Sequence, residues 1–316
     1  MGFLSRMLGK GSSSTEQLQR TTPATAQRIK NILSIRQLES MPAQAARAFQ
    51  LATDPNATAA DFVKVIEADE VLSARIVRVA NSVYFFRGTP ATDIEKAVAN
   101  IGLDELRCLI SSTMLRSLLQ GRHKAREQVW ANGVAVGICC RTLSRYTNAS
   151  TGEAFLCGLL HDVGKLVMIR RGGTDYDQVL RKVSSGQKSF VEAEEEVFQV
   201  SHVEVGKWVA ESWNFPPSTI LAIGGHHEQW PKDERLTGRG TPLAMLVKAG
   251  DIIAHSLGLG HTPQMRPFQS SNREQLQAAF LQLGVPESER ESFLINFKKQ
   301  FEQESGLYQM EELHGS

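Results

Sequence analysis

Residues 159 to 167, LLHDVGKLV, place an imidazole beside a carboxylate, at His161 and Asp162, within an otherwise apolar segment. Neighbours on a helix point about 100° apart, yet both side chains can reach one cation that lies beside the helix. Histidine with aspartate suits a divalent first-row metal ion. The pair therefore either holds a metal or is what remains of a site that once did, and the answer depends on partners elsewhere in the chain.

A second carboxylate, Asp251, lies in the apolar stretch LAMLVKAGDIIAHSL. A carboxylate among apolar residues is costly unless a cation or hydrogen-bond donors satisfy it. A metal ion shared with His161 and Asp162 would do so. The alternative without metal is a pair between Asp251 and His255, which follows four residues later on the same helical face.

Three more imidazoles complete the set of candidate ligands. His202 lies at the start of SHVEVGKWV, and His226 and His227 are adjacent in GHHE. A lone buried histidine is usually a hydrogen-bonded core residue. Donors spread over four helices of one subdomain indicate instead a candidate site for a divalent ion, with iron, manganese, magnesium and zinc as the candidates.

The composition describes a globular protein without a global attraction to nucleic acid. At 316 residues the chain is long for one core, so two packed subdomains, or one domain with added segments, are expected. The net charge of +1 predicts no DNA partner. Four cysteines without a C-x-x-C pair are expected to be reduced core residues of a cytoplasmic protein.

The first ten residues, MGFLSRMLGK, form a short amphipathic start. As a helix they would gather apolar side chains on one face beside two basic residues, which fits peripheral contact of residues 1–10 with a partner or with the inner membrane. Barely two turns make a marginal helix, so we favour a flexible tail over residues 1–24. No stretch approaches the roughly 18 apolar residues of a membrane span.

Apolar residues recur at intervals of three and four along almost all of the chain, and no convincing alternating strand pattern occurs. An all-α fold follows. Thr58 is expected to cap one helix, and Gly102 to end another. Residues 152–171 are apolar enough to form a central helix, and two amphipathic helices are expected near 273–283 and 286–303.

The order of LLHDVGKL, HVEVGKWVAESWNFP, GHHE and AGD is similar to that in the HD superfamily of metal-dependent phosphohydrolases. The stretch from about 35 to 260 resembles its HDOD branch, because MPAQAARAFQL, EADEVLSARIVRVANS and EKAVANIGLDELRCL match the N-terminal half of HDOD domains. The resemblance implies an all-α fold in which an N-terminal helical subdomain packs on an HD-like helical core. It also implies a bacterial signalling or regulatory protein.

These observations predict four parts of the chain. A flexible tail at 1–24 precedes an N-terminal helical subdomain at 25–125 and an HD-like helical subdomain at 126–261. A polar junction and extra C-terminal helices occupy 262–316.

Two departures from the superfamily bear on activity. Active members carry a further metal-binding histidine on the helix where this chain reads VWANGVAV, and the aligned residue is Asn132. A neutral amide oxygen is a weaker ligand than imidazole for such metals. The branch that hydrolyses cyclic di-GMP carries a GYP signature after its paired histidines, whereas HHEQWPKDER here lacks it.

Two hypotheses remain. In one, the protein is a phosphohydrolase for a nucleotide or cyclic dinucleotide, with two ions held by His161, Asp162 and Asp251 and by His202, His226 and His227, while Lys165 stabilises phosphate charge. In the other, which we favour, the HD core is a non-catalytic scaffold that binds signalling proteins, with a metal or nucleotide in a degenerate site.

A candidate partner surface is NSVYFFRGTP, where Tyr84, Phe85 and Phe86 follow a helix. Three consecutive aromatic residues at one helix end cannot all face the same core, so at least one is expected to be exposed and to anchor a partner. The alternative is that the three plug the junction between subdomains.

Overall fold

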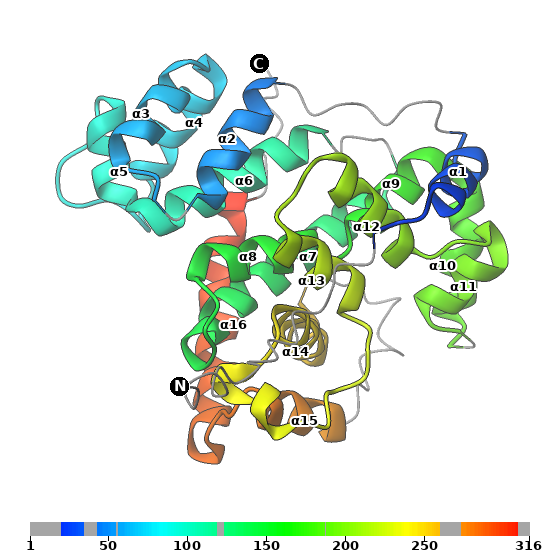
Figure 1. Ribbon diagram of the computed structural model, residues 1–316. Coiled ribbons are helices and arrows are strands. Elements are labelled where there is room, and N and C mark those ends of the chain that lie inside the picture. The colour runs from blue at the N-terminus through cyan, green and yellow to red at the C-terminus, as the bar shows by residue number, and fades with distance from the viewer. Residues whose placement is uncertain are drawn as a thin grey trace, which may run out of the picture.

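The computed structural model describes residues 20–34, 43–54, 56–118, 123–186, 188–259 and 273–308 (Figure 1). These residues form sixteen α-helices and four short 3-10 helices, without a strand. The all-α prediction is therefore confirmed. Most of the predicted tail and the polar junction at 262–272 lie outside the described residues. In the described part of the chain, no helix combines the length and the apolar character needed to cross a membrane.

The first helical group, α2 to α6, contains helices whose boundaries follow from local capping. Thr58 accepts from the backbone of Asp61 and the Asp61 carboxylate reaches back to Thr58, a capping box. Gly102, at φ 85°, ends α5 as expected. The group consists of α2 (Ala43–Thr53), α3 (Ala59–Glu67), α4 (Glu70–Ala80), α5 (Ile94–Ile101) and α6 (Leu103–Leu118).

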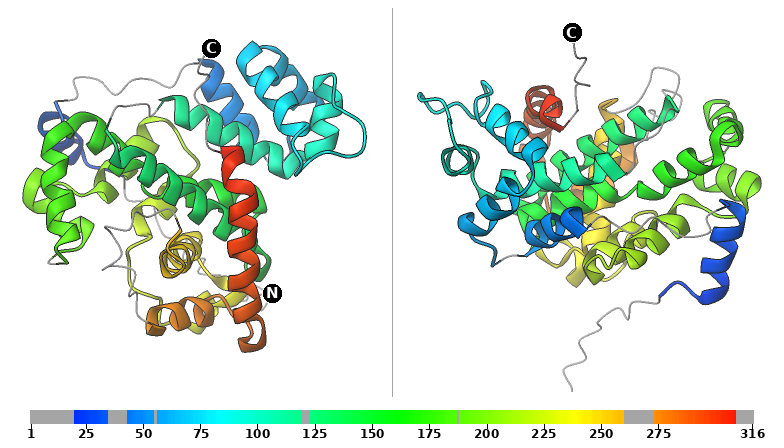
Figure 2. Two further views of the ribbon diagram at one scale, coloured as in Figure 1. Left: turned by 180° about the vertical axis from the view of Figure 1, so that it is seen from behind. Right: turned by 90° about the horizontal axis from the view of Figure 1, so that it is seen from above.

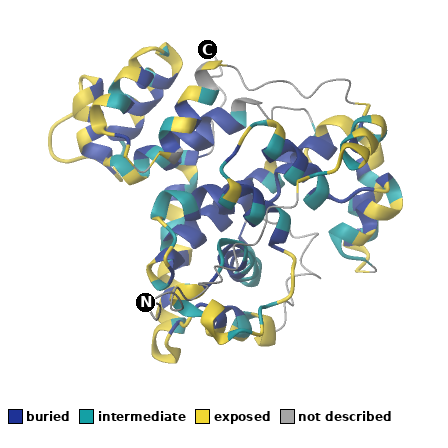
Figure 3. Ribbon diagram, viewed as in Figure 1, coloured by how far each residue is buried: buried dark blue, intermediate teal, exposed yellow. Residues whose placement is uncertain are grey.

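The second helical group, α7 to α14, surrounds a pair of closely packed helices, α7 and α8. A Cβ atom on Gly133 would lie 2.7 Å from the carbonyl oxygen of Leu159, and one on Gly158 would lie 2.8 Å from the Cα atom of Gly137. Only glycine permits this approach of α7 and α8, and the middle of both helices is buried (Figure 3). The helices are α7 (Ala125–Leu143), α8 (Thr151–Leu160), α9 (Val163–Gly172), α10 (Tyr176–Ser184), α11 (Phe190–Phe198), α12 (His202–Ser212), α13 (Pro217–Gly225) and α14 (Leu243–Ser256).

The expectation of one central helix over residues 152–171 is wrong, because the helix is interrupted at His161 and Asp162, between α8 and α9. Asp162 has φ −102° and ψ 18°, outside the helical range. The break redirects α9 onto α12, where a Cβ on Gly164 would lie only 1.9 Å from the carbonyl oxygen of His202. Glycine at 164 thus brings the backbones of two site-bearing helices together.

Helix α1 (Pro23–Ile32) lies at the edge of the second helical group, and polar contacts join it to α12 (Figures 1 and 2). Arg28 forms an ion pair with Glu204, and the backbone N–H of Thr21 donates to the carboxylate of Glu211 at 2.9 Å. The predicted range 25–125 therefore includes a helix whose polar contacts are with the second helical group.

The C-terminal helices are α15 (Arg273–Gln282) and α16 (Glu287–Tyr308), close to the two expected ranges. The last turns of α16 contact both helical groups. Arg141 of α7 pairs with the buried Glu304, which also accepts from the Tyr84 hydroxyl at 2.6 Å. Arg75 of α4 donates to the carbonyl oxygen of Leu307 at 2.9 Å. Helix α16 therefore joins the two groups through buried polar contacts.

Candidate metal centre

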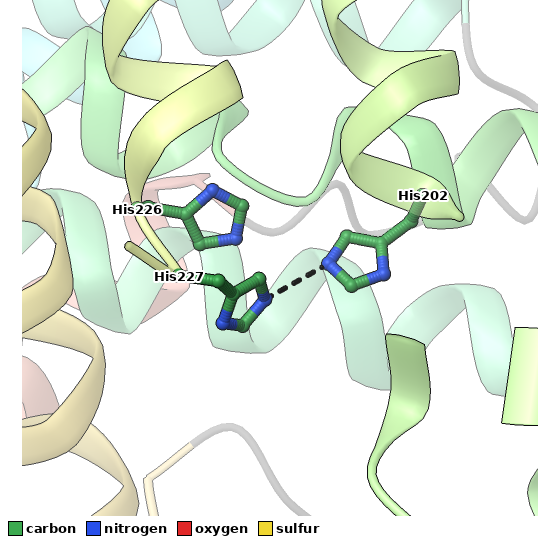
Figure 4. Close-up of side chains that lie close together, drawn as sticks. All are labelled: His202, His226 and His227. Atoms are coloured by element: carbon green, nitrogen blue, oxygen red, sulfur yellow. Dashed lines mark hydrogen bonds between the residues drawn. The ribbon is translucent and has the colours of Figure 1, made fainter. Parts of the chain in front are cut away.

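The six predicted metal ligands come together in the second helical group. His161 and Asp162 form the break between α8 and α9, and His202 is the first residue of α12. His226 and His227 directly follow α13, and Asp251 lies on α14. Figure 4 shows that the rings of His202, His226 and His227 converge from two directions. Two overlapping sets could hold an ion: His202 with His226 and His227, and His161 with Asp162 and His226.

Backbone and carboxylate acceptors orient three of the rings through Nδ1. His161 donates to the carbonyl oxygen of Gly158 and His226 to that of Ile223, each at 2.8 Å. His202 donates to Glu194 at 2.6 Å. In a neutral imidazole with the proton on Nδ1, the lone pair is on Nε2, which is the atom that faces the cluster. Ligand histidines in metal sites are held in this way.

Within the cluster, three buried polar atoms lack a hydrogen-bond partner among the described residues: Oδ1 of Asp162, Nε2 of His226 and Oδ1 of Asp251. Oδ1 of Asp162 lies 3.4 Å from Nε2 of His202 and 3.9 Å from Nε2 of His226. Nε2 of His202 lies 3.1 Å from Nε2 of His227. Ligands about 2.1 Å from a zinc ion lie about 3.4 Å apart in a tetrahedron. The donor set therefore fits a divalent ion that faces Oδ1 of Asp162.

The other oxygen of Asp162 lies in a different environment. Its Oδ2 atom is 2.6 Å from Nζ of Lys165 and 3.3 Å from Nε2 of His161. The buried Lys165 ammonium also lies 4.2 Å from the centre of the Phe190 ring. Nε2 of His161 is 3.6 Å from Oδ1 of Asp251. Positive side chains therefore already neutralise this side of the cluster.

The pKa values of the histidines differ in the same way between the two sides of Asp162. Burial alone would lower the pKa of His161, but Asp162 and Asp251 outweigh it and raise that pKa to about 10. Burial, with His227 and His161 nearby, lowers the pKa of His226 well below its usual range. Burial, with His202 and Lys165, lowers the pKa of His227 to about 4. At neutral pH the protein thus favours a protonated His161 but neutral rings at 226 and 227, ready to bind a cation.

Asp251 also takes part in the contact with His255 that was expected as the alternative to metal. Nδ1 of His255 donates to the backbone carbonyl of Asp251 at 2.8 Å and lies 2.9 Å from its Oδ1 atom. Burial opposes the ionisation of Asp251, yet His255 and His161 hold its pKa well below the usual range. Asp251 is therefore stabilised by imidazoles on both sides.

Exposure of the cluster is confined to one side. His161, Asp162, His202 and His226 are buried, whereas His227 is exposed. The side chains of Asp251 and His255 keep 17% and 25% of their exposure. A ligand that approaches the cluster must therefore pass the rim formed by His227, Asp251 and His255.

The remaining predicted residues lie as follows. Asn132 is buried on α7 beside Gly133, which contacts Leu159 two residues before His161. Lys165 contacts Asp162 rather than solvent. In the proposed partner surface, Phe85 is buried, the Tyr84 hydroxyl donates to Glu304, and Phe86 is 45% exposed.

Glu194, in the acidic segment SFVEAEEEVF, is a site residue that the sequence interpretation missed. Glu194 is fully buried and accepts from His202, while Tyr176 donates to its other oxygen at 2.9 Å. The spacing of apolar residues around Glu194 does indicate that it is buried. Glu194 follows Phe190 by four residues and precedes Val197 by three, which puts it on the apolar face of α11.

Known proteins resemble this chain in sequence over more than half of its length. The HDOD domain matches residues 38–229. An uncharacterized protein of Treponema pallidum is 28% identical over 218 residues, which are 66% of this chain but only 40% of that protein.

Solved structures share the fold. An HDOD domain protein of unknown function from Geobacter sulfurreducens has a TM-score of 0.70 at 23% identity, covering 90% of this chain and 96% of that one. A proposed signal transduction protein of Marinobacter aquaeolei has a TM-score of 0.71 at 22% identity, covering 90% of this chain and 66% of that one. A proposed phosphohydrolase of Shewanella amazonensis has a TM-score of 0.66 at 20% identity, covering 89% and 96%.

Proposed function

The chain belongs to the HDOD domain family, and from this premise we propose that it is a signalling protein that holds one divalent ion and binds protein partners without hydrolysing a substrate. The ligands of the ion are His202, His226, His227 and Oδ1 of Asp162. Three imidazoles with one carboxylate suit iron, manganese or zinc better than magnesium, which prefers oxygen ligands.

The unequal surroundings of the two Asp162 oxygens support the single ion. Lys165 and His161 neutralise Oδ2. Oδ1 has no hydrogen-bond partner in the described part of the chain and faces imidazoles whose Nδ1 atoms are already engaged by Glu194 and Ile223. A buried anionic oxygen in that position is costly without a cation. A divalent ion would supply that charge and would lower the pKa of a water that completes its coordination.

A role without turnover is supported by the positively charged side chains beside Oδ2 of Asp162. Two-metal hydrolysis uses a pair of ions to stabilise both the attacking and the leaving oxygen. Here the protonated His161 and the Lys165 ammonium place positive charge where the second ion would lie. Asn132 stands where the active members of the superfamily, which this chain resembles, carry a histidine.

Partner binding is supported by the exposed aromatic side chain of Phe86, with Val83 fully exposed beside it in the connection between α4 and α5. Phe85, which we expected to share this surface, is 3% exposed and belongs to the core. Exposed aromatic residues are enriched among the residues that dominate binding energy at protein interfaces.

A metal-dependent phosphohydrolase is the second candidate, supported by the convergence of all six predicted donors on one cluster. If turnover occurs, Lys165 would act on phosphate charge only after it leaves Asp162. The substrate would have to enter past the rim at His227 and Asp251.

Metal content, measured by mass spectrometry on protein purified without chelator or affinity tag, tests the proposal. We expect about one ion per chain in the wild type, none in Asp162→Ala, and an unchanged content in Asp233→Ala, which alters an exposed carboxylate. Absence of metal from the wild type would reject the ion site. Metal-dependent hydrolysis of bis-p-nitrophenyl phosphate or a cyclic dinucleotide, abolished by Asp162→Ala, would reject the scaffold role and establish the second candidate.

A further inference from the structure

The buried carboxylate of Glu194 is held against His202 from two sides. Its Oε2 atom accepts from Nδ1 of the His202 ring at 2.6 Å and from the His202 backbone N–H at 2.7 Å. We infer that Glu194 is a positioning residue that fixes both the rotation and the tautomer of His202 for the ion. This inference rests on the proposed metal site.

Two hydrogen bonds to one oxygen constrain the ring more than either bond alone. His202 is the first residue of α12, so its backbone N–H is one of the donors that have no partner within the helix. By accepting from this N–H, Glu194 is fixed relative to the helix axis. By accepting from the ring as well, it fixes the ring relative to the same axis, with Nε2 directed at His227.

The other oxygen of Glu194 is fixed by Tyr176 of α10, whose hydroxyl donates to Oε1 at 2.9 Å. Tyr176, Glu194 and His202 are all fully buried. Three donors thus surround the two oxygens of the Glu194 carboxylate, which acts as an acceptor and holds the His202 proton on Nδ1.

The tautomer of His202 has a consequence for His227. Since Nε2 of His202 carries a lone pair, the 3.1 Å contact between the two Nε2 atoms requires His227 to be the donor in the metal-free protein. An ion that binds both rings must replace this proton. His202 thus presents an unprotonated Nε2 to the ion without any change. The exposed His227 must instead lose the proton from its Nε2 atom before it can bind the ion.

The test compares Glu194→Leu, Glu194→Gln and the wild type in the full-length protein. Leucine removes the acceptor, whereas glutamine can keep an oxygen at the position of Oε2 and present its amide to Tyr176. The matched control is Glu195→Leu, the same substitution at the exposed neighbour on α11. The readouts are the ¹⁵N spectrum of the His202 ring in metal-free protein and the zinc dissociation constant by competition with a chromophoric chelator.

In the metal-free wild type, we expect Nε2 of His202 to be unprotonated. In Glu194→Leu, we expect this preference for the tautomer with the proton on Nδ1 to be lost. Zinc affinity should fall by about 10- to 100-fold in Glu194→Leu, recover largely in Glu194→Gln and stay unchanged in Glu195→Leu. A wild-type His202 that is protonated on Nε2, or wild-type zinc affinity in Glu194→Leu, would overturn the role of Glu194.

A Glu194→Leu protein that does not fold would leave the wild-type spectrum and the Glu194→Gln affinity to decide the role. A wild type that binds no zinc would reject the proposed ion site, whereas the ring spectra, recorded without metal, would still decide whether Glu194 sets the tautomer.

Discussion

The Lys165 ammonium lies 2.6 Å from Oδ2 of Asp162, on the opposite oxygen from the one that faces the histidines. Burial disfavours a charged lysine, but Asp162 and Glu194 outweigh this and raise the pKa of Lys165. The ammonium is therefore a permanent cation inside the cluster. It divides the cluster into a side that is already neutral and a side that needs an ion.

Replacing Lys165 should open the neutral side to a second ion. We expect Lys165→Met to raise the zinc or manganese content from about one to about two ions per chain at saturating metal, because Oδ2 of Asp162 then loses the nearer of its two cationic neighbours. Methionine keeps most of the side-chain length over Phe190. Lys182→Met, at a partly exposed lysine of α10, is the control and should leave the content at one. A content of one in Lys165→Met as well would show that the lysine is not what excludes a second ion.

The cluster histidines also predict how stability depends on pH in metal-free protein. His226 and His227 have lowered pKa values, about 4 for His227, so the unfolded chain takes up protons at a pH where the folded protein does not. Their contribution to stability is therefore lost as the pH falls from about 6.5 towards 4. His161 has a pKa raised to about 10, so its contribution is present below pH 6.5 and lost as the pH rises towards 10.

We therefore expect the melting temperature of chelator-treated protein to be highest near pH 6.5 and to fall on both sides. Calorimetry between pH 5 and 9 measures this directly. His161→Gln should flatten the alkaline side while leaving the acidic side in place. A wild-type melting temperature that rises steadily up to pH 9 would contradict the raised pKa of His161.

The sequence predicted which residues the structure brings together in the cluster, because histidines and aspartates within apolar segments are rare and costly, so their positions carry information. It did not reveal that the helix breaks at His161, since the local pattern of residues 152–171 is continuous. The break accompanies the close contact of Gly164 with α12, which is distant in the sequence. Likewise, the role of Glu194 on α11 depends on its contact with His202 on α12. Periodicity along one helix cannot reveal such contacts.

Gly164→Ala should disrupt the approach of α9 to α12. The added Cβ would lie 1.9 Å from the carbonyl oxygen of His202, which is backbone and cannot rotate away. We expect a loss of about 3 kcal/mol in the free energy of unfolding, measured in urea, together with weaker metal binding.

The control is Gly152→Ala on α8, where the nearest atom, Cδ of Arg107, is 3.5 Å away. It should stabilise the protein by up to about 1 kcal/mol through helix propensity. Equal stability of both variants would show that the contact at Gly164 relaxes.

The attachment of α16 predicts unequal effects of removing two of its acids. Glu304→Ala leaves the buried Arg141 without that carboxylate, and removing one partner of a buried pair costs about 3–5 kcal/mol. Glu289→Ala removes an exposed carboxylate near Arg145 and should cost less than about 1 kcal/mol. Urea denaturation of both variants makes the comparison. A small effect of Glu304→Ala would mean that α16 is not held by this pair.

The neighbouring aromatic residues Phe85 and Phe86 are expected to have different roles, Phe85 in the core and Phe86 on the surface. Phe85 is 3% exposed, so Phe85→Ala should destabilise the protein by about 3–5 kcal/mol. Phe86 is 45% exposed, so Phe86→Ala should leave the helical circular dichroism and the melting temperature unchanged while weakening partner capture in a quantitative pull-down. A large loss of stability in Phe86→Ala would assign Phe86 to the core. Unchanged capture would exclude it from the partner surface.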